Sequence, residues 1–83
     1  MKKTIYDPRY YELTAWLKRQ RIEKQFTMRA LAQKLGCSYS FIGKYERNEI
    51  RLDVLQYQEI CSALGIDSAE GLKLIKGHQK SED

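Results

Sequence analysis

The chain has 83 residues, a length that fits one domain with a single core, and 42% of them are hydrophobic. No run of 18 apolar residues occurs, and residues 1–8 lack the apolar block of a signal peptide, so we expect a cytoplasmic, nucleoid-associated protein without a membrane span. Cys37 and Cys61 stand outside any CxxC motif, so we expect reduced, buried thiols rather than a disulfide or a zinc site.

We divide the chain into an N-terminal arm (1–6), a helical domain (7–76) and a disordered polar tail (77–83). The first predicted helix opens with Asp7 as N-cap and Pro8 at the first helical position, and it runs to about Lys24. Its inward stripe is apolar until it reaches Arg21. An arginine on an inward face needs an acidic partner, and Glu46 is the candidate.

Residues 27–46 predict two short helices joined by a tight turn. Thr27 is the N-cap of the first of them, and Gly36 is its left-handed stop. Ser38 is the N-cap of the second. The apolar face of this second helix, which would pack on the first, consists of Phe41, Ile42 and Tyr45.

A fourth helix is predicted from Asp53 as N-cap to Gly65 as stop. Its core face is predicted to consist of Val54, Tyr57, Cys61 and Leu64. Leu55 lies off this phase, and together with Leu52 it makes the surface near the helix start more apolar than a monomer needs, so we predict that both form dimer contacts. A short fifth helix from Ser68 to about Ile75 supplies Leu72 and Ile75, which close either the core or the dimer interface; the sequence leaves both options open.

Charge is distributed unevenly along the chain. Residues 9–51 carry ten Lys or Arg against four Glu, a net charge of +6, whereas residues 52–83 carry three against six, a net charge of −3. A basic block that coincides with the two short helices is typical of a surface that binds phosphates. A merely soluble basic face is the alternative.

The spacing of Ala32, Gly36, Ile42 and Tyr45 resembles the helix-turn-helix of the Cro/repressor (Xre-like) DNA-binding family, and the similarity extends ungapped over about residues 7–66. This resemblance implies an all-α, lambda-repressor-like bundle of about five helices. It also implies an ion pair at the positions of Arg21 and Glu46. The chain departs from the family where the usual Gln is Met28 and the usual Gly is Asn48.

In such a fold the second helix of the motif, about residues 38–47, lies in the major groove. The base contacts are then expected from Ser38, Tyr39, Ser40, Gly43 and Lys44, with Gly43 on the exposed face, where its missing side chain permits close approach of the backbone to DNA. Phosphate contacts are expected from Thr27, Met28, Arg29, Arg47, Asn48 and Arg51.

The sequence therefore predicts a regulator of transcription, a repressor or autoregulator, that binds a palindromic operator in double-stranded DNA as a homodimer. The alternative is a protein-interaction module, such as an antitoxin that holds a toxin or another regulatory protein. An enzyme is not expected, because the single histidine, His78, lies in the polar tail and no acids have metal-ligand spacing. No cofactor or metal is expected.

Overall fold

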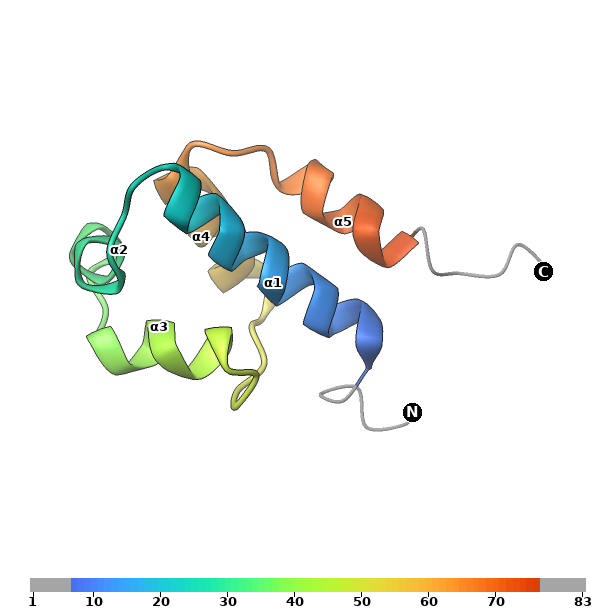
Figure 1. The fold of residues 1–83 in the computed structure, drawn as a ribbon, viewed down its shortest axis with the longest axis horizontal. Coiled ribbons are helices and arrows are strands. Elements are labelled where there is room, and N and C mark those ends of the chain that lie inside the picture. The colour runs from blue at the N-terminus through green and yellow to red at the C-terminus, as the bar shows by residue number, and fades with distance from the viewer. Residues whose placement is uncertain (1–6, 77–83) are drawn as a thin grey trace, which may run out of the picture.

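The computed structural model describes residues 7–76, which fold into five helices without a strand. Their order and bounds are α1 (Pro8–Glu23), α2 (Met28–Leu35), α3 (Tyr39–Glu46), α4 (Val54–Leu64) and α5 (Ser68–Lys76) (Figure 1). The predicted all-α class is confirmed. The predicted arm (1–6) and the predicted disordered tail (77–83), which holds His78, lie outside the described residues.

Side-chain caps fix where the helices begin. The side chains of Asp7, Thr27, Ser38 and Asp53 each accept a hydrogen bond from a backbone N–H in the first turn of the helix that follows. This satisfies one of the N–H groups that a helix start leaves without an intrahelical partner. At the other end, Gly36 and Gly65 both have a φ of +72°, a conformation that only glycine adopts at little cost, and they end α2 and α4.

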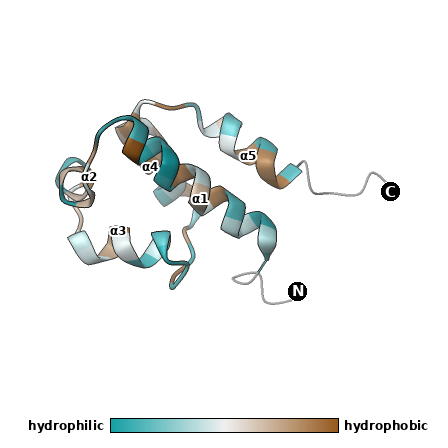
Figure 2. Cartoon of the chain, in the orientation of Figure 1, coloured by the Kyte–Doolittle hydropathy of each residue, from teal (hydrophilic) through white to brown (hydrophobic). Residues whose placement is uncertain are grey.

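The core lies between α1, the two helix-turn-helix helices α2 and α3, and α4. It is built from Leu17, Leu31, Ile42, Ile60 and Cys61, which are all at most 1% exposed. Ala32 is also buried, so that α2 and α3 pack against each other directly. In Figure 2 the ribbon of α3 is pale at its start, brown in part of its middle and teal at its C-terminal end, so apolar and polar residues share this short helix.

Helix α5 closes the core of the monomer. Gly71 is buried, and a Cβ atom at this position would lie within 3 Å of side-chain atoms of Leu13, Trp16 and Tyr57. The hydroxyl of Tyr57 donates a hydrogen bond to the carbonyl of Ser68. This helix therefore packs tightly against α1 and α4, and Ile75 packs partly buried against the same core.

Two residues that the sequence analysis expected to be buried are exposed. Val54 was expected in the core, but it is 76% exposed, because it is the first residue of α4 and the buried stripe of this helix begins only at Tyr57. Ile60, which was not among the predicted core residues of this helix, is 1% exposed. Cys37 was expected to be buried, but it is exposed, because it follows the left-handed Gly36 on the outside of the turn between α2 and α3. Cys61 is buried as predicted.

Candidate nucleic-acid interface

The outer face of α3 consists of polar side chains. Ser38 accepts a hydrogen bond from the N–H of Phe41 at 3.2 Å, and its hydroxyl also lies 3.2 Å from that of Ser40. Tyr39, Ser40 and Lys44 are exposed, whereas Ile42 and Tyr45 on the opposite side are fully buried. The helix thus presents hydrogen-bonding groups outward, and the major groove of B-DNA is wide enough to admit one α-helix.

Tyr39 is held by a residue of the preceding helix. The guanidinium carbon of Arg29 lies 4.6 Å from the centre of the Tyr39 ring, within the range of a cation–π contact, while half of the Tyr39 surface stays exposed. Next to them, a shallow hollow of about 460 Å³ between α2 and α3 is lined in part by Thr27 and Gln33. The sequence analysis named both Tyr39 and Arg29 as DNA contacts. It did not predict the contact between the two side chains, because they belong to different helices.

Gly43 lies on the outer side of α3 but is not exposed, which corrects the prediction. The position of a Cβ atom at Gly43 would be 2.8 Å from Nη1 of Arg47, so the arginine side chain lies over the glycine. Side chains on a helix lean toward its N-terminus, and this direction carries Arg47 back by one turn. Close approach of the Gly43 backbone to DNA is therefore blocked while Arg47 stays in place.

Five of the six residues predicted to contact phosphates lie in two places, at the start of α2 and after α3, and the sixth turns inward. Thr27, Met28 and Arg29 lie at the start of α2, where the Thr27 hydroxyl caps Ala30 and the Met28 side chain packs half-buried against the core. Only the backbone N–H groups and the Arg29 side chain there are available to an anion. Arg47 and Arg51 are exposed after α3.

Asn48 is the exception. Its φ of +64° is left-handed, a conformation that Asn tolerates in place of Gly. Its side chain turns inward, where Oδ1 accepts a hydrogen bond of 2.7 Å from the hydroxyl of Thr14. Thr14 is buried in α1. Asn48 therefore fixes the end of α3 to α1 and is not placed with the other candidates.

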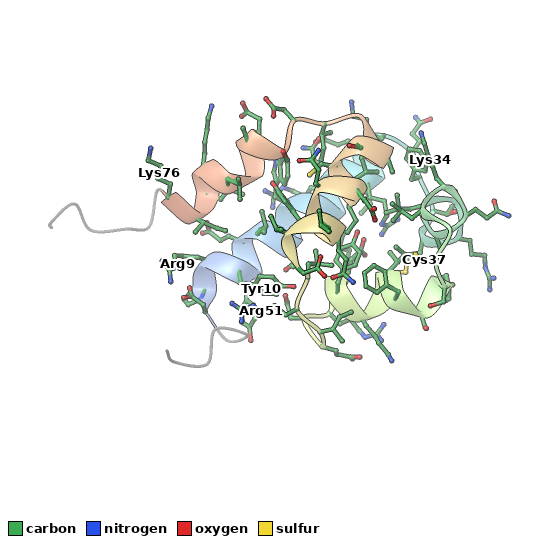
Figure 3. All side chains as sticks on the ribbon, turned by 180° about the vertical axis from the view of Figure 1, so that it is seen from behind. Arg9, Tyr10, Lys34, Cys37, Arg51 and Lys76 are labelled. Carbon is green, nitrogen blue, oxygen red and sulfur yellow. The ribbon has the colours of Figure 1, made fainter. Side chains whose placement is uncertain are left out.

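The loop between α3 and α4 is tied to α1 by one tyrosine. The hydroxyl of Tyr10 donates to the carbonyl of Ile50 at 3.1 Å and accepts from the N–H of Leu52 at 3.0 Å. The guanidinium of Arg51 lies 5.6 Å from the Tyr10 ring centre, and Figure 3 shows both side chains beside Arg9 at the start of α1. Desolvation by burial raises the pKa of Tyr10, so its hydroxyl stays protonated and able to donate.

The predicted ion pair between Arg21 and Glu46 is present. Nε of Arg21 donates to Oε2 of Glu46 at 2.7 Å, and Nη2 donates to Oε1 at 3.2 Å. Nη1 donates to the carbonyl of Phe26 at 2.8 Å. The pair is buried, so it orients α3 on α1 rather than contributing a charge to the outer surface.

The four predicted dimer residues differ in exposure. Leu55 is 71% exposed and Leu72 is 49% exposed, whereas Leu52 and Ile75 pack partly buried against the core. Val54, beside Leu55, adds to the exposed apolar surface at the start of α4. Two adjacent exposed apolar side chains indicate an interface more strongly than isolated ones do.

Within residues 7–76 no group of three or more His, Cys, Asp or Glu side chains is placed to hold a metal ion. In the same range no helix has both the length and the apolar character that a membrane crossing requires.

Comparisons with known proteins find similarity to a family model and to solved structures. A helix-turn-helix family model matches residues 17–70. The structure of an XRE-family like protein from Pseudomonas syringae pv. tomato str. DC3000 superposes with a TM-score of 0.82 at 32% sequence identity, covering 93% of this chain and 94% of that chain. No curated protein matches the chain.

Proposed function

The chain belongs to the XRE-type helix-turn-helix family, a non-enzymatic family of DNA-binding transcription regulators. From this premise we propose that it binds a specific operator in double-stranded DNA as a homodimer and acts as a repressor or autoregulator. In this proposal it works in the cytoplasm, on the nucleoid. The observation that carries the proposal is the exposed polar face of α3 within a motif whose helices are rigidly packed.

In the proposed complex α3 lies in the major groove, and its first turn meets the base edges. Tyr39 offers an aromatic face to a thymine methyl group and a hydroxyl to a base edge, Ser40 offers a hydroxyl, and Lys44 one turn later offers an ammonium to guanine or phosphate. Ser38 contributes less, because its oxygen already caps the helix. These contacts would specify the sequence.

The phosphate contacts would hold the protein in register. The N–H groups of Met28 and Arg29 at the start of α2 point out of the helix, and a positive partial charge gathers there. Arg29, Arg47 and Arg51 carry full charges near the two ends of the motif. Such contacts add affinity without reading sequence, so they should make binding strongly dependent on salt.

A homodimer would use the exposed apolar residues at the start of α4, Val54 and Leu55. Two-fold symmetry would place the two copies of α3 about 34 Å apart, one turn of the double helix, and would require a palindromic operator. The alternative partner, a toxin or another regulatory protein, would meet the same apolar surface.

The experiment measures binding of the wild type and of a Tyr39→Ala, Lys44→Ala double variant to DNA from its own promoter and to random DNA at two salt concentrations. We expect the wild type to prefer its promoter and the variant to keep only weak, salt-sensitive binding to both DNAs. Lys73→Ala, which removes a positive charge from α5, is the control that should keep the preference. If the wild type itself shows no preference, the DNA proposal fails and the protein-partner alternative takes its place.

A further inference from the structure

A groove runs between the C-terminal end of α2 and the helix α4. It consists of two hollows, of about 240 Å³ and about 390 Å³, which share Leu35 and Glu59 in their linings. Leu35 and Ala63 are half-buried and pack against the core, so the floor of the groove is apolar. The groove thus offers a second surface a partly apolar place to bind.

The groove is separate from the surfaces that the proposed function uses. Tyr39 and Lys44 on the outer face of α3 do not line it, and neither does Leu55 at the start of α4. Figure 3 shows Lys34, which lines the larger hollow, well away from Arg51 in the loop before α4. The groove therefore has no role in the proposed contacts with bases or in the proposed dimer.

Each wall of the groove carries one charged side chain without an oppositely charged partner. Within residues 7–76, the carboxylate of Glu59 on α4 has no hydrogen bond and no ion pair. Nζ of Lys34 on α2 lies 5.3 Å from the centre of the Phe26 ring, but no acid of the same range pairs with it. Both side chains are exposed, so both charges are available to a partner.

A second copy of the chain has the complementary surface. A partner of this groove needs an acid opposite Lys34 and a base opposite Glu59. A two-fold contact supplies both, because it pairs residue i of one copy with residue j of the other, and j with i. An axis through the larger hollow, which both charges line, brings Lys34 of each copy toward Glu59 of the other.

We propose that this groove is a second self-contact surface, through which one proposed dimer binds another on neighbouring operators. The partner is another copy of this chain, held by two reciprocal pairs of Lys34 and Glu59 over the apolar floor. Exposed ion pairs contribute little, so the contact is weak in the free protein and becomes effective where DNA holds two dimers close together. The role on DNA rests on the proposed function, whereas the contact itself does not.

The first test measures the contact without DNA, in a Leu55→Glu background that removes the proposed dimer contact. Amide NMR spectra are recorded from dilute to concentrated protein. We expect the signals of Leu35, Glu59 and Ala63 to shift with concentration, and these shifts to shrink as salt rises, because salt screens exposed charges. The signal of Ile22, which is exposed on α1, should not shift.

The second test reverses the two charges one at a time in the same background. Lys34→Glu and Glu59→Lys each place like charges opposite each other in both pairs, so each variant alone should lose the concentration-dependent shifts. A mixture of the two variants should regain them, because every pair then joins an acid on one copy to a base on the other. Lys18→Glu, a charge reversal at an exposed position of α1, is the control and should keep the shifts.

Thermal unfolding of each variant checks that it folds. If a reversal unfolds early, Lys34→Gln and Glu59→Gln take its place, and each should reduce the shifts because it removes one member of both pairs. Single reversals that still self-associate, or a mixture that does not, would overturn the inference. Since no DNA is present, this failure leaves the proposed DNA binding intact, whereas a wild type without operator preference would overturn the proposed function and not the contact.

On DNA the contact should appear as cooperativity between two neighbouring operators. In footprint titrations, binding at one operator should raise the affinity of the other for the wild type and for the double variant Lys34→Glu, Glu59→Lys, which restores both pairs. Either single variant should fill the two operators independently. A uniform change in DNA affinity cancels, because both operators lie on one DNA. Equal cooperativity in the single variants and the wild type would contradict the role on DNA.

Discussion

The guanidinium of Arg21 and the carboxylate of Glu46 form a buried bidentate ion pair that joins α1 to the C-terminal end of α3. A third donor of Arg21 binds the carbonyl of Phe26 in the turn before α2. One side chain therefore fixes three segments of the motif at once. Since the orientation of α3 decides which side chains face outward, this pair sets the geometry of the candidate interface.

Breaking the pair should destabilise the fold strongly. Arg21→Ala and Glu46→Ala should each lower the free energy of unfolding by about 3–5 kcal/mol, because each leaves a buried charge without its partner. The double variant Arg21→Leu, Glu46→Leu should be more stable than either single variant, because no charge remains. Urea unfolding measures the free energy of unfolding of the two single variants and the double variant. If each single variant lost less than about 1 kcal/mol, the ion pair would behave like one on the surface.

The hydroxyl of Tyr45 should be dispensable for stability. Tyr45 is fully buried, and its hydroxyl has no hydrogen-bond partner among the described residues. Burial raises the pKa of this phenol, so it stays neutral. Tyr45→Phe should leave the free energy of unfolding unchanged or raise it by up to about 1 kcal/mol, because an unpaired buried hydroxyl costs free energy. The control Ile42→Ala should lower the free energy of unfolding by about 2–5 kcal/mol. An equally large decrease in Tyr45→Phe would contradict the prediction, because it would mean that the Tyr45 hydroxyl has a hydrogen-bond partner.

Gly71 should tolerate no side chain. An added Cβ would collide with Trp16, Tyr57 and Leu13, so Gly71→Ala should destabilise the protein by about 1–3 kcal/mol even though alanine favours a helix. Lys73→Ala, on the exposed side of the same helix, should change stability by less than about 1 kcal/mol. Thermal unfolding compares the two. A stabilised Gly71→Ala variant would mean that α5 is free to move away from α1.

The two thiols should differ in reactivity. Cys37 is exposed and Cys61 is buried, so a thiol reagent should modify Cys37 quickly and Cys61 only after the protein unfolds. Desolvation raises the pKa of both thiols, so the rate at Cys37 should still increase with pH above the ordinary thiol value. Mass spectrometry of the labelled peptides identifies the site. Equal rates in the folded protein would contradict the placement of Cys37 on the outside of the turn.

The proposed dimer should depend on Leu55. This residue is 71% exposed, so Leu55→Glu should fold normally but shift the protein toward monomers in sedimentation equilibrium and weaken operator binding. Ile22→Glu, at an exposed apolar position of α1, is the matched control and should behave like the wild type. A wild type that is monomeric at the concentrations of DNA binding would refute the homodimer, and a dimeric Leu55→Glu variant would move the interface elsewhere.

The sequence by itself determined the order of the helices and the family, because caps, left-handed stops and apolar spacing act within a few residues of chain. Asp7, Thr27, Ser38 and Asp53 start their helices as predicted, and Gly36 and Gly65 end theirs. Charge and spacing also identified the partner of Arg21, because a buried arginine requires an acid.

Only the tertiary structure decided which of these residues are covered. Val54 lies on the predicted apolar face of its helix but is 76% exposed, and Cys37 is exposed after the turn at Gly36. Gly43 lies on the outer face but under Arg47, and α5 closes the core through Gly71. Periodicity gives the direction of a side chain from its own helix, whereas burial depends on what a distant segment places in front of it.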